Sequence, residues 1–398
     1  MKKVIVLIVS LLIAAAIFLF IGCSSDMSTS PDNSANVLSQ KLDSAPGMKD
    51  VLIGFSNGRP DDALTSAGAV IKKEYKYLPI VFASVPEENI NRLRNNPNIA
   101  YIANNDIREF TAQTLDWGVD RIDADYVWTN TVYNGSGVNV AILDTGGDMD
   151  HPDLTWAGGF SAVHDDPSDF DDKVGHGTHC AGIVSANNND IGVVGVAPNC
   201  DIYAVQISDN KFIYTDNVLT GIDWIIGTHF DGDAGNDIQV VNMSFGGAYE
   251  NTAEGAAMLE MYNLGILLVS SAGNNSGPVS YPAKYDFIMA ISASDQYDAF
   301  ASFSNFGPEI ELIAPGVRIL STYKMGKYWP LSGTSMASPM VVGAAAVAMQ
   351  KYPNYTHEQI RALLNGSAED IGLTAFQQGN GLVDVEKAVL GTTNGDDF

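Results

Sequence analysis

The sequence predicts an α/β domain with a mostly parallel sheet and helices on both faces, preceded by a small α+β unit. From about residue 111 onward, short runs rich in Val, Ile and Ala alternate with helical stretches and glycine-rich turns. Continuous apolar strands of this kind belong to parallel sheets that are buried on both faces. The runs are residues 138–143, 202–207, 238–243 and 265–270. In such a fold, chemistry is expected beyond the carboxyl ends of the strands.

The composition indicates a folded chain and argues against some classes of binding partner. The 398 residues suggest two or three folding units, and an apolar fraction of 46% is ample for a core. Asp and Glu number 47 against 21 Lys and Arg, which gives a net charge of -26. This charge repels nucleic acid and anionic membranes but suits cation binding, so we expect no nucleic-acid partner. Only 17% of residues are charged, which excludes a disordered polyanion.

Residues 1–22 have the layout of a secretory signal peptide. Lys2 and Lys3 form a positive start, and residues 4–21 form a predominantly apolar run. This is the order of an n-region followed by an h-region. The run is also near the lower length limit for a membrane span, so a retained anchor stays open as an alternative.

The residues that follow indicate how the exported chain is attached to the membrane. Phe20-Ile21-Gly22-Cys23 resembles a bacterial lipobox, in which the cysteine is lipidated after cleavage, so we expect a lipid anchor at Cys23. Ordinary secretion is the other alternative. Residues 23–47 are rich in Ser, Asp and Asn and form a polar tether. All three alternatives make the rest of the protein extracytoplasmic.

Residues 48–110 form a compact α+β pattern of their own. A helix begins after Pro86 with acidic residues in its first turn, where the helix dipole favours them, and Asn96-Pro97 ends it. The strand candidates around it are residues 51–55, 69–77, 80–85 and 99–102.

Two motifs in the second unit place ionisable side chains at the ends of predicted elements. Asp144 follows a buried strand and precedes Thr145-Gly146, where a simple turn or capping role is an alternative. His176 and His179 lie three residues apart at an apparent helix start. A metal pair is one interpretation of the histidines, but zinc needs three or four ligands and no nearby spacing completes a familiar set.

A third motif places Ser335 at the start of an apolar, alanine-rich helix that includes residues 340–349. The positive end of a helix stabilises negative charge that develops nearby, which suits a nucleophile. Ser332 and Ser338 are competing candidates, and composition does not separate them.

Together these motifs resemble the active-site motifs of subtilisin-like serine proteases. The order is Asp-Thr-Gly at 144–146, Gly-His-Gly-Thr-His at 175–179 and Gly-Thr-Ser-Met-Ala-Ser-Pro at 333–339. The order Asp, His, Ser separates this family from chymotrypsin-like enzymes and α/β-hydrolases. The resemblance covers roughly residues 111–390, and more weakly residues 48–110, which resemble the family's propeptide.

The resemblance implies a serine endopeptidase that forms an acyl-enzyme. Ser335 would be the nucleophile, His176 the general base and Asp144 the group that orients the imidazole. Asn274, in the segment Ser-Ala-Gly-Asn at 271–274, would stabilise the oxyanion together with the Ser335 N–H. The implied organisation is a signal peptide, a tether, a propeptide and a catalytic domain at residues 1–22, 23–47, 48–110 and 111–398. We expect a monomer that acts on protein or peptide substrates, with its own propeptide as intramolecular chaperone and inhibitor.

Substrate-binding segments are also implied. Residues 242–247 resemble the strand that pairs with an extended substrate through main-chain hydrogen bonds. The implied substrate-binding residues are Ser244, Phe245, Gly246, Ser271, Ala272, Gly273 and Ser280. Because no acidic residue is evident at the pocket floor, we expect an apolar or aromatic side chain before the scissile bond. Phe110-Thr111 resembles the family's processing site, and Phe110 fits that preference.

Residues 187–198 resemble the strong calcium loop of subtilisins. Ca²⁺ takes several oxygen ligands, including carboxylates and backbone carbonyls. The implied ligands are Gln113, Asp153, Asn187, Asn189, Ile191 and Val193. Gln113 reaches this position only if processing occurs just before it. A polar, Asn-rich loop without a metal is the alternative.

Two points stay open at this stage. Cys180 and Cys200 could pair, although free buried thiols are the interpretation that general cysteine burial favours. The second open point is whether the chain is instead a non-catalytic or propeptide-locked binding protein on a protease scaffold. The intact triad and Asn274 motifs argue against it.

Overall fold

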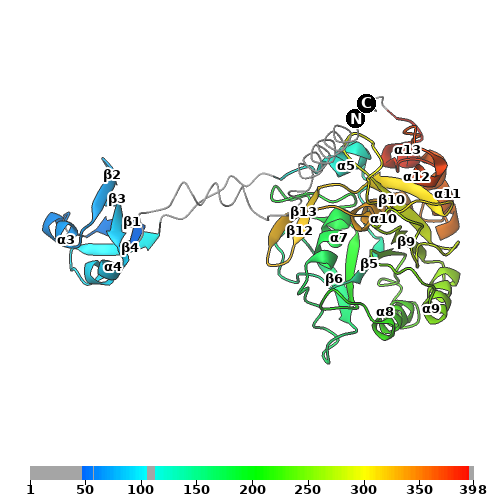
Figure 1. The fold of residues 1–398 in the computed structure, drawn as a ribbon, viewed down its shortest axis with the longest axis horizontal. Coiled ribbons are helices and arrows are strands. Elements are labelled where there is room, and N and C mark those ends of the chain that lie inside the picture. Colours follow the sequence, from blue (N-terminus) through cyan, green and yellow to red (C-terminus); the bar gives the residue numbers. More distant parts are fainter. Residues whose placement is uncertain (1–46, 57, 105–112, 394–398) are drawn as a thin grey trace, which may run out of the picture. The chain divides into compact units, whose positions relative to one another are not determined.

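The computed structural model describes residues 47–56, 58–104 and 113–393, which form two compact units (Figure 1). Among these residues, no helix is long and apolar enough to span a membrane. The predicted signal peptide, the lipidation site at Cys23, nearly all of the tether and the Phe110-Thr111 junction lie outside the described residues.

The first unit is a four-stranded antiparallel sheet with two short helices. Its strand order is β2-β3-β1-β4. The elements are β1 (Met48–Phe55), α3 (Asp61–Ser66), β2 (Val70–Glu74), β3 (Ile80–Pro86), α4 (Glu87–Arg94) and β4 (Ile99–Asn104). Val51, Ile53 and Leu93 lie in its buried core. The predicted α+β unit is confirmed, with the addition of α3, which the sequence analysis did not include.

The second unit is built on a seven-stranded sheet in which all neighbouring strands are parallel, in the order β11-β10-β9-β8-β5-β7-β6. The strands are β5 (Asn139–Asp144), β6 (Trp156–Ser161), β7 (Asp201–Gln206), β8 (Val240–Met243), β9 (Leu267–Ser271), β10 (Met289–Ser294) and β11 (Ile310–Pro315). A separate hairpin consists of β12 (Ile319–Tyr323) and β13 (Lys327–Leu331). The predicted α/β class with a mostly parallel sheet is therefore confirmed.

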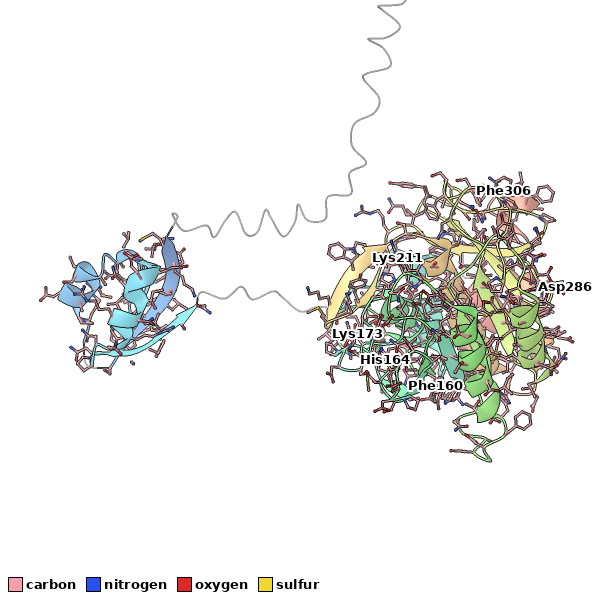
Figure 2. The ribbon with its side chains drawn as sticks, turned by 60° about the horizontal axis from the view of Figure 1, so that its bottom comes forward. Phe160, His164, Lys173, Lys211, Asp286 and Phe306 are labelled. Carbon is pink, nitrogen blue, oxygen red and sulfur yellow. The ribbon has the colours of Figure 1, made fainter. Side chains whose placement is uncertain are left out.

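Helices cover both faces of this sheet, and alternate residues of its central strand β5 point into two separate cores. Val140 and Ile142 of β5 belong to the core under α7 (His176–Ser185) and α10 (Thr334–Lys351). Ala141 and Leu143 belong to the core under α8 (Thr215–Thr228) and α9 (Thr252–Asn263), which Figure 2 shows side by side. The remaining helices are α5 (Trp117–Arg121), α6 (Ala124–Asn130), α11 (His357–Ser367), α12 (Ala375–Gln378) and α13 (Val385–Leu390).

The order of the strands places a switch point beside β5. From β5 the chain runs to the edge strand β6, returns to β7, and then crosses to β8 on the other side of β5. At such a point the helices leave opposite faces of the sheet, which opens a crevice beyond the carboxyl ends of the strands. Asp144 is the last residue of β5 and lies at this position.

Candidate active site

Asp144 and His176 form a paired carboxylate and imidazole at the switch point. The Asp144 side chain is 3% exposed, and His176 is the first residue of α7. His176 Nδ1 lies 2.7 Å from Asp144 Oδ1 and 2.9 Å from Oδ2. Because a carboxylate only accepts hydrogen bonds, Nδ1 carries the proton and Nε2 is left as a base. Burial is the largest single influence and lowers the pKa of His176, but Asp144 and, to a lesser extent, Cys180 together raise it, and the net pKa lies well above the ordinary histidine value.

Glycines allow the two elements to come close enough for this pair. A Cβ on Gly177, the second residue of α7, would lie 2.2 Å from the carbonyl oxygen of Gly146 in the turn after β5. Gly146 itself has φ +99°, a left-handed conformation that glycine adopts without strain. The glycines of both motifs therefore set the distance between Asp144 and His176.

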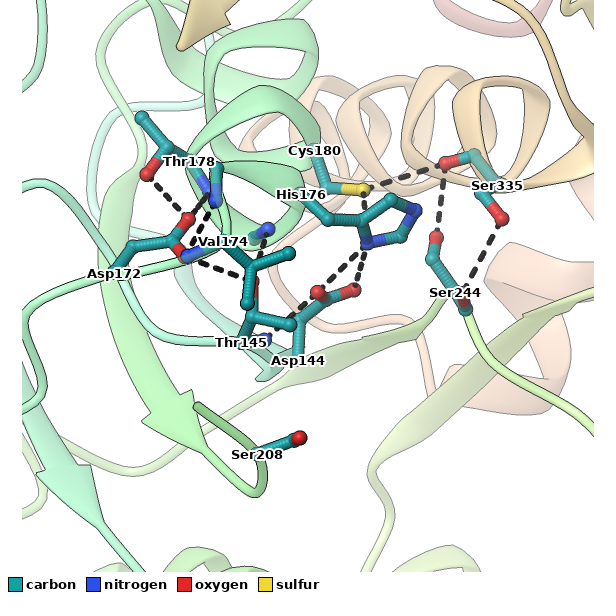
Figure 3. Close-up of polar contacts among 12 residues, drawn as sticks. Asp144, Thr145, Asp172, Val174, His176, Thr178, Cys180, Ser208, Ser244 and Ser335 are labelled. Carbon is teal, nitrogen blue, oxygen red and sulfur yellow. Dashed lines mark hydrogen bonds and ion pairs between the residues drawn. The ribbon is translucent and has the colours of Figure 1, made fainter. Parts of the chain in front are cut away.

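Ser335 is the second residue of α10, where backbone N–H groups have no acceptor inside the helix. Its hydroxyl donates to the carbonyl of Ser244 at 3.2 Å, and its own carbonyl accepts from Ser244 Oγ at 2.9 Å. Figure 3 shows the His176 ring between the Asp144 carboxylate and Ser335.

The two competing serines are engaged elsewhere. Ser338 is fully buried and donates to Asn242 Oδ1 at 2.9 Å. Ser332 Oγ accepts from the Arg318 N–H at 2.8 Å. Ser335 is the serine of this motif that lies beside the Asp144–His176 pair (Figure 3).

Asn274 is held with its amide toward the start of α10. Its Oδ1 accepts from both the N–H and the hydroxyl of Thr334, at 2.8 and 2.9 Å. This leaves Nδ2 on the side of Gly333, where an added Cβ would lie 3.3 Å from it. Asn274 Nδ2 and the Ser335 N–H are thus donors at the same end of the helix.

The implied substrate segments lie next to each other. Gly247 and Tyr281 exchange two backbone hydrogen bonds, of 2.8 and 2.9 Å, which join the loop after β8 to the segment of Ser280. A Cβ on Gly246 would lie 2.8 Å from the carbonyl of Tyr281, so the glycine permits this approach. Ser271 is the last residue of β9, Ala272 follows it, and both are buried. Phe245 is partly buried and packs against the core under α8 and α9.

Asn305 holds the turn at Ala272 and Gly273 to the segment of Ser280, and the sequence analysis missed it. Its fully buried Nδ2 lies 3.0 Å from the carbonyl of Ala272 and 3.3 Å from Ser280 Oγ. A Cβ on Gly273, whose φ is +108°, would lie 2.3 Å from Asn305 Nδ2. Asn305 follows Ser304 in a loop without periodicity, so no sequence pattern marked its contacts with residues about 30 positions away.

The implied calcium ligands also lie together. Asp153 is fully buried, its Oδ2 accepts from the Val193 N–H at 2.9 Å, and its Oδ1 has no hydrogen-bond partner. Gln113 Nε2 donates to the carbonyl of Asn187 at 2.6 Å and to that of Val193 at 3.0 Å. The chain is unprocessed, so the expectation that Gln113 reaches this loop only after cleavage just before it is wrong. Asn189 belongs to the same loop, and its Oδ1 accepts from the Ile191 N–H at 3.1 Å. Convergent carbonyls beside an unpartnered buried carboxylate oxygen are the donor set that Ca²⁺ prefers, so these residues fit the ion.

The second histidine and the cysteines do not form a metal pair or a disulfide. His179 Nε2 donates toward the carbonyls of Ile319 and Trp329, at 3.1 and 2.8 Å. Cys180 and Cys200 are both free and buried. Cys180 Sγ lies 4.0 Å from His176 Nδ1 and 3.4 Å from the carbonyl of Ser335, so this thiol fills the space between base and helix start.

Comparison with known families agrees with this geometry. Residues 135–381 match the model of the subtilase family. This chain belongs to the subtilase family. The chain is 42% identical to the thermostable alkaline protease of Halalkalibacterium halodurans over 318 residues, which cover 79% of this chain and 84% of the relative.

Other relatives match over similar lengths. Subtilisin E of Bacillus subtilis is 36% identical over 348 residues, covering 86% of this chain and 89% of its own. An alkaline protease of Alkalihalobacillus alcalophilus is 39% identical over 318 residues, covering 79% and 80%. The predicted subtilase is thus confirmed as a serine endopeptidase that acts on protein substrates.

Proposed function

We propose that this subtilase hydrolyses peptide bonds through an acyl-enzyme on Ser335, with His176 as general base and Asp144 as its orienting carboxylate. The observation that carries the proposal is the Asp144–His176 pair, at 2.7 Å, beside a serine at a helix start. As Ser335 attacks the substrate carbonyl, the proton that it now donates to Ser244 passes to His176 Nε2. His176 then protonates the leaving amine, and water completes hydrolysis by the same route.

Asn274 Nδ2 and the Ser335 N–H stabilise the oxyanion in this mechanism. Both are fixed before the reaction, one by Thr334 and the other by α10, so little reorganisation is needed as charge develops. The positive end of α10 adds to this stabilisation.

The substrate runs extended along residues 244–246. The side chain of its residue before the scissile bond lies between the segment 271–273 and the segment of Ser280. The side chains at the pocket, Ser271, Ala272 and Ser280, carry no charge. We infer a broad preference for apolar or aromatic residues there. The two named alkaline proteases and the raised pKa of His176 support activity that rises toward alkaline pH.

Calcium is the proposed structural cofactor. Asp153 and Asn189 would offer side-chain oxygens, and Asn187, Ile191 and Val193 would offer carbonyls. Gln113 would offer its oxygen once its amide, whose Nε2 now donates to the carbonyls of Asn187 and Val193, has turned over. The ion would supply positive charge next to the unpartnered Asp153 oxygen and would hold the loop to the segment at Gln113. One backbone hydrogen bond already joins this segment to the loop, from the Thr114 N–H to the carbonyl of Gly192 at 2.7 Å.

The first unit is proposed as a propeptide that assists folding and inhibits until it is removed. The enzyme is proposed to work as a monomer outside the cytoplasm, either secreted or anchored through Cys23. The apolar run and lipobox-like residues at the start of the sequence support this location.

The test of the activity is a comparison of the parent enzyme with Ser335→Ala. We expect the parent to process itself near Phe110 and hydrolyse casein, and the variant to do neither. A variant that processes and hydrolyses casein as well as the parent would show that the assignment is wrong. Intact-mass and N-terminal analysis of the mature protein would identify the cleavage bond and any lipid.

A further inference from the structure

Asp172 is a buried carboxylate just before the helix that carries His176. It is 4% exposed and accepts five hydrogen bonds. Oδ1 accepts from the Val174 N–H at 2.9 Å, the Gly175 N–H at 2.7 Å and Thr145 Oγ1 at 3.0 Å. Oδ2 accepts from the Thr178 N–H at 2.9 Å and Thr178 Oγ1 at 2.7 Å. Figure 3 shows Asp172 joined to these elements.

Backbone donors favour the ionised form of this side chain. An N–H group only donates, and each oxygen of Asp172 receives at least one of them, so no proton fits on either side without losing a bond. Burial raises the pKa of Asp172, while the bonds from Gly175 and Thr178 oppose the rise. The net pKa is raised, but all five hydrogen bonds to the side chain come from donors, which favours its ionised form.

The same carboxylate caps α7 from outside the helix. The residue at the N-cap position is Gly175, which has no side chain to offer. Asp172 instead takes up the N–H groups of Gly175 and Thr178. It also holds Thr145, whose Oγ1 accepts from the Gly177 N–H at 2.9 Å. Asp172 thus ties the first turn of α7 to the residue that follows Asp144.

The position of His176 gives this cap a chemical consequence. His176 is the first residue of α7, where the positive end of the helix disfavours an imidazolium. The proposed mechanism forms an imidazolium there. A negative charge that satisfies the helix end offsets this effect, as the known stabilisation of acidic groups at helix N-termini implies.

We propose that Asp172 is a positioning residue for catalysis, which holds the first turn of α7 against β5 and offsets the helix charge so that His176 can accept the proton of Ser335. The proposal rests on the proposed role of His176 as general base. It deepens that role, because it assigns part of the basicity of His176 to a carboxylate that does not touch it.

The other groups around His176 define what Asp172 adds. β5 contributes Asp144, α7 contributes Cys180 and His179, β12 contributes Tyr323, β7 contributes the neutral Gln206, and the first turn of α10 is uncharged. The turn after β5 contributes Asp148 and Asp150 and the turn after β12 contributes Lys324, which line one cavity with Asp172. Burial lowers the pKa of His179 to about 4, so this ring is neutral during activity. Tyr323 donates its hydroxyl to the carbonyl of Val174 at 3.1 Å. On the loop itself, Asp171 pairs with Lys173 at 2.5 Å.

The first experiment compares Asp172→Asn with Asp171→Asn in the full chain. Both changes remove one carboxylate charge from adjacent residues, but Asp171 is partly exposed and paired with Lys173. We expect Asp172→Asn to move the acid limb of kcat/KM for a chromogenic peptide to lower pH by about 0.3 to 1 unit. We expect kcat to fall by about two- to tenfold with KM unchanged, because the imidazolium loses stabilisation. Asp171→Asn should leave both quantities as in the parent. An unshifted limb in Asp172→Asn, or an equal shift in Asp171→Asn, would overturn the proposal.

A second pair of measurements separates this proposal from the proposed function and from simple loss of folding. The pKa of His176, followed by imidazole NMR in the Ser335→Ala background, should fall with Asp172→Asn whether or not the parent is a peptidase. Should Asp172→Asn not fold, Thr178→Val removes one donor to Asp172, together with the acceptor of the Asp148 N–H, and keeps the carboxylate charge. We expect this variant to have a lower kcat with the acid limb in place. A shifted limb, or the kcat of the parent, would contradict the proposed division of labour.

Discussion

Removal of calcium should destabilise the catalytic unit, and Asp153 gives the size of the effect. Without an ion, its Oδ1 is a buried charged oxygen that lacks a partner. Leaving such a group unsatisfied costs about 1 to 3 kcal/mol. Mass action gives a similar figure, about 2.7 kcal/mol when free calcium is one hundred times the dissociation constant. For the unit Phe110–Phe398, with an unfolding entropy of about 2.1 cal/mol/K per residue, this corresponds to a fall in Tm of about 2 to 5 °C on chelation.

The assay is thermal unfolding of the processed Ser335→Ala variant, which does not digest itself, in calcium and in excess EDTA. Asp153→Asn should lower Tm in calcium and remove most of the response to EDTA. The matched control is Asp190→Asn, which removes a charge from an exposed residue of the same loop. Asp190 has φ +72°, a conformation that asparagine tolerates, so this control should keep the full response.

Two results would refute this reasoning. One is a Tm that does not change between calcium and EDTA in the parent. The other is an equal response to EDTA in Asp153→Asn and in the parent, which would place the ion elsewhere. Magnesium at the same concentration should not replace calcium, because it requires shorter bonds and retains its water.

The other predictions concern the reacting groups. Asn274→Ala should lower kcat by about a hundred- to a thousandfold with a small change in KM, the loss known for the corresponding donor of subtilisin, and a KM effect alone would contradict its role. The acid limb of kcat/KM should lie above pH 6.5, because Asp144 raises the pKa of His176 and only the neutral ring is a base; a limb below 6 would count against the pair. Mercurials should inhibit through Cys180, 4.0 Å from the base, and Cys180→Ala should resist them while remaining active. Stability should fall as pH drops from 6.5 to about 4, since His179 stays neutral in the folded state while the unfolded chain takes up a proton; unfolding midpoints that stay flat over this range would contradict it.

The strands and motifs were predictable because each depends on residues close together in the chain. The four apolar runs occur as β5, β7, β8 and β9 with shifts of one or two residues at their ends. Helix α3 was not predicted, since six residues are too few to show helical periodicity. Its signals were Pro60 before the helix and Asp61-Asp62 in the first turn.

What the sequence did not indicate depends on contacts between distant segments. Asp172 lies in the acidic stretch 165–172, where most carboxylates are exposed and the buried one has no distinguishing neighbour. Likewise, Ser332, Ser335 and Ser338 are equivalent by composition and differ only in which groups surround them after folding. The order of strands, which places β8 and β7 on either side of Asp144, has no local signature either.

Asp172 and Asn305 show how this fold makes a rigid site from loops. Both are buried side chains with polar oxygens or nitrogens, and both bond mainly to backbone groups of segments that carry the proposed chemistry. Asp172 holds the start of α7, and Asn305 holds the turn at Ala272 and Gly273. Since loops lack the repeating hydrogen bonds of a sheet, a buried polar side chain is the element that fixes their geometry. The proposed specificity and basicity therefore depend on residues that need not touch the substrate.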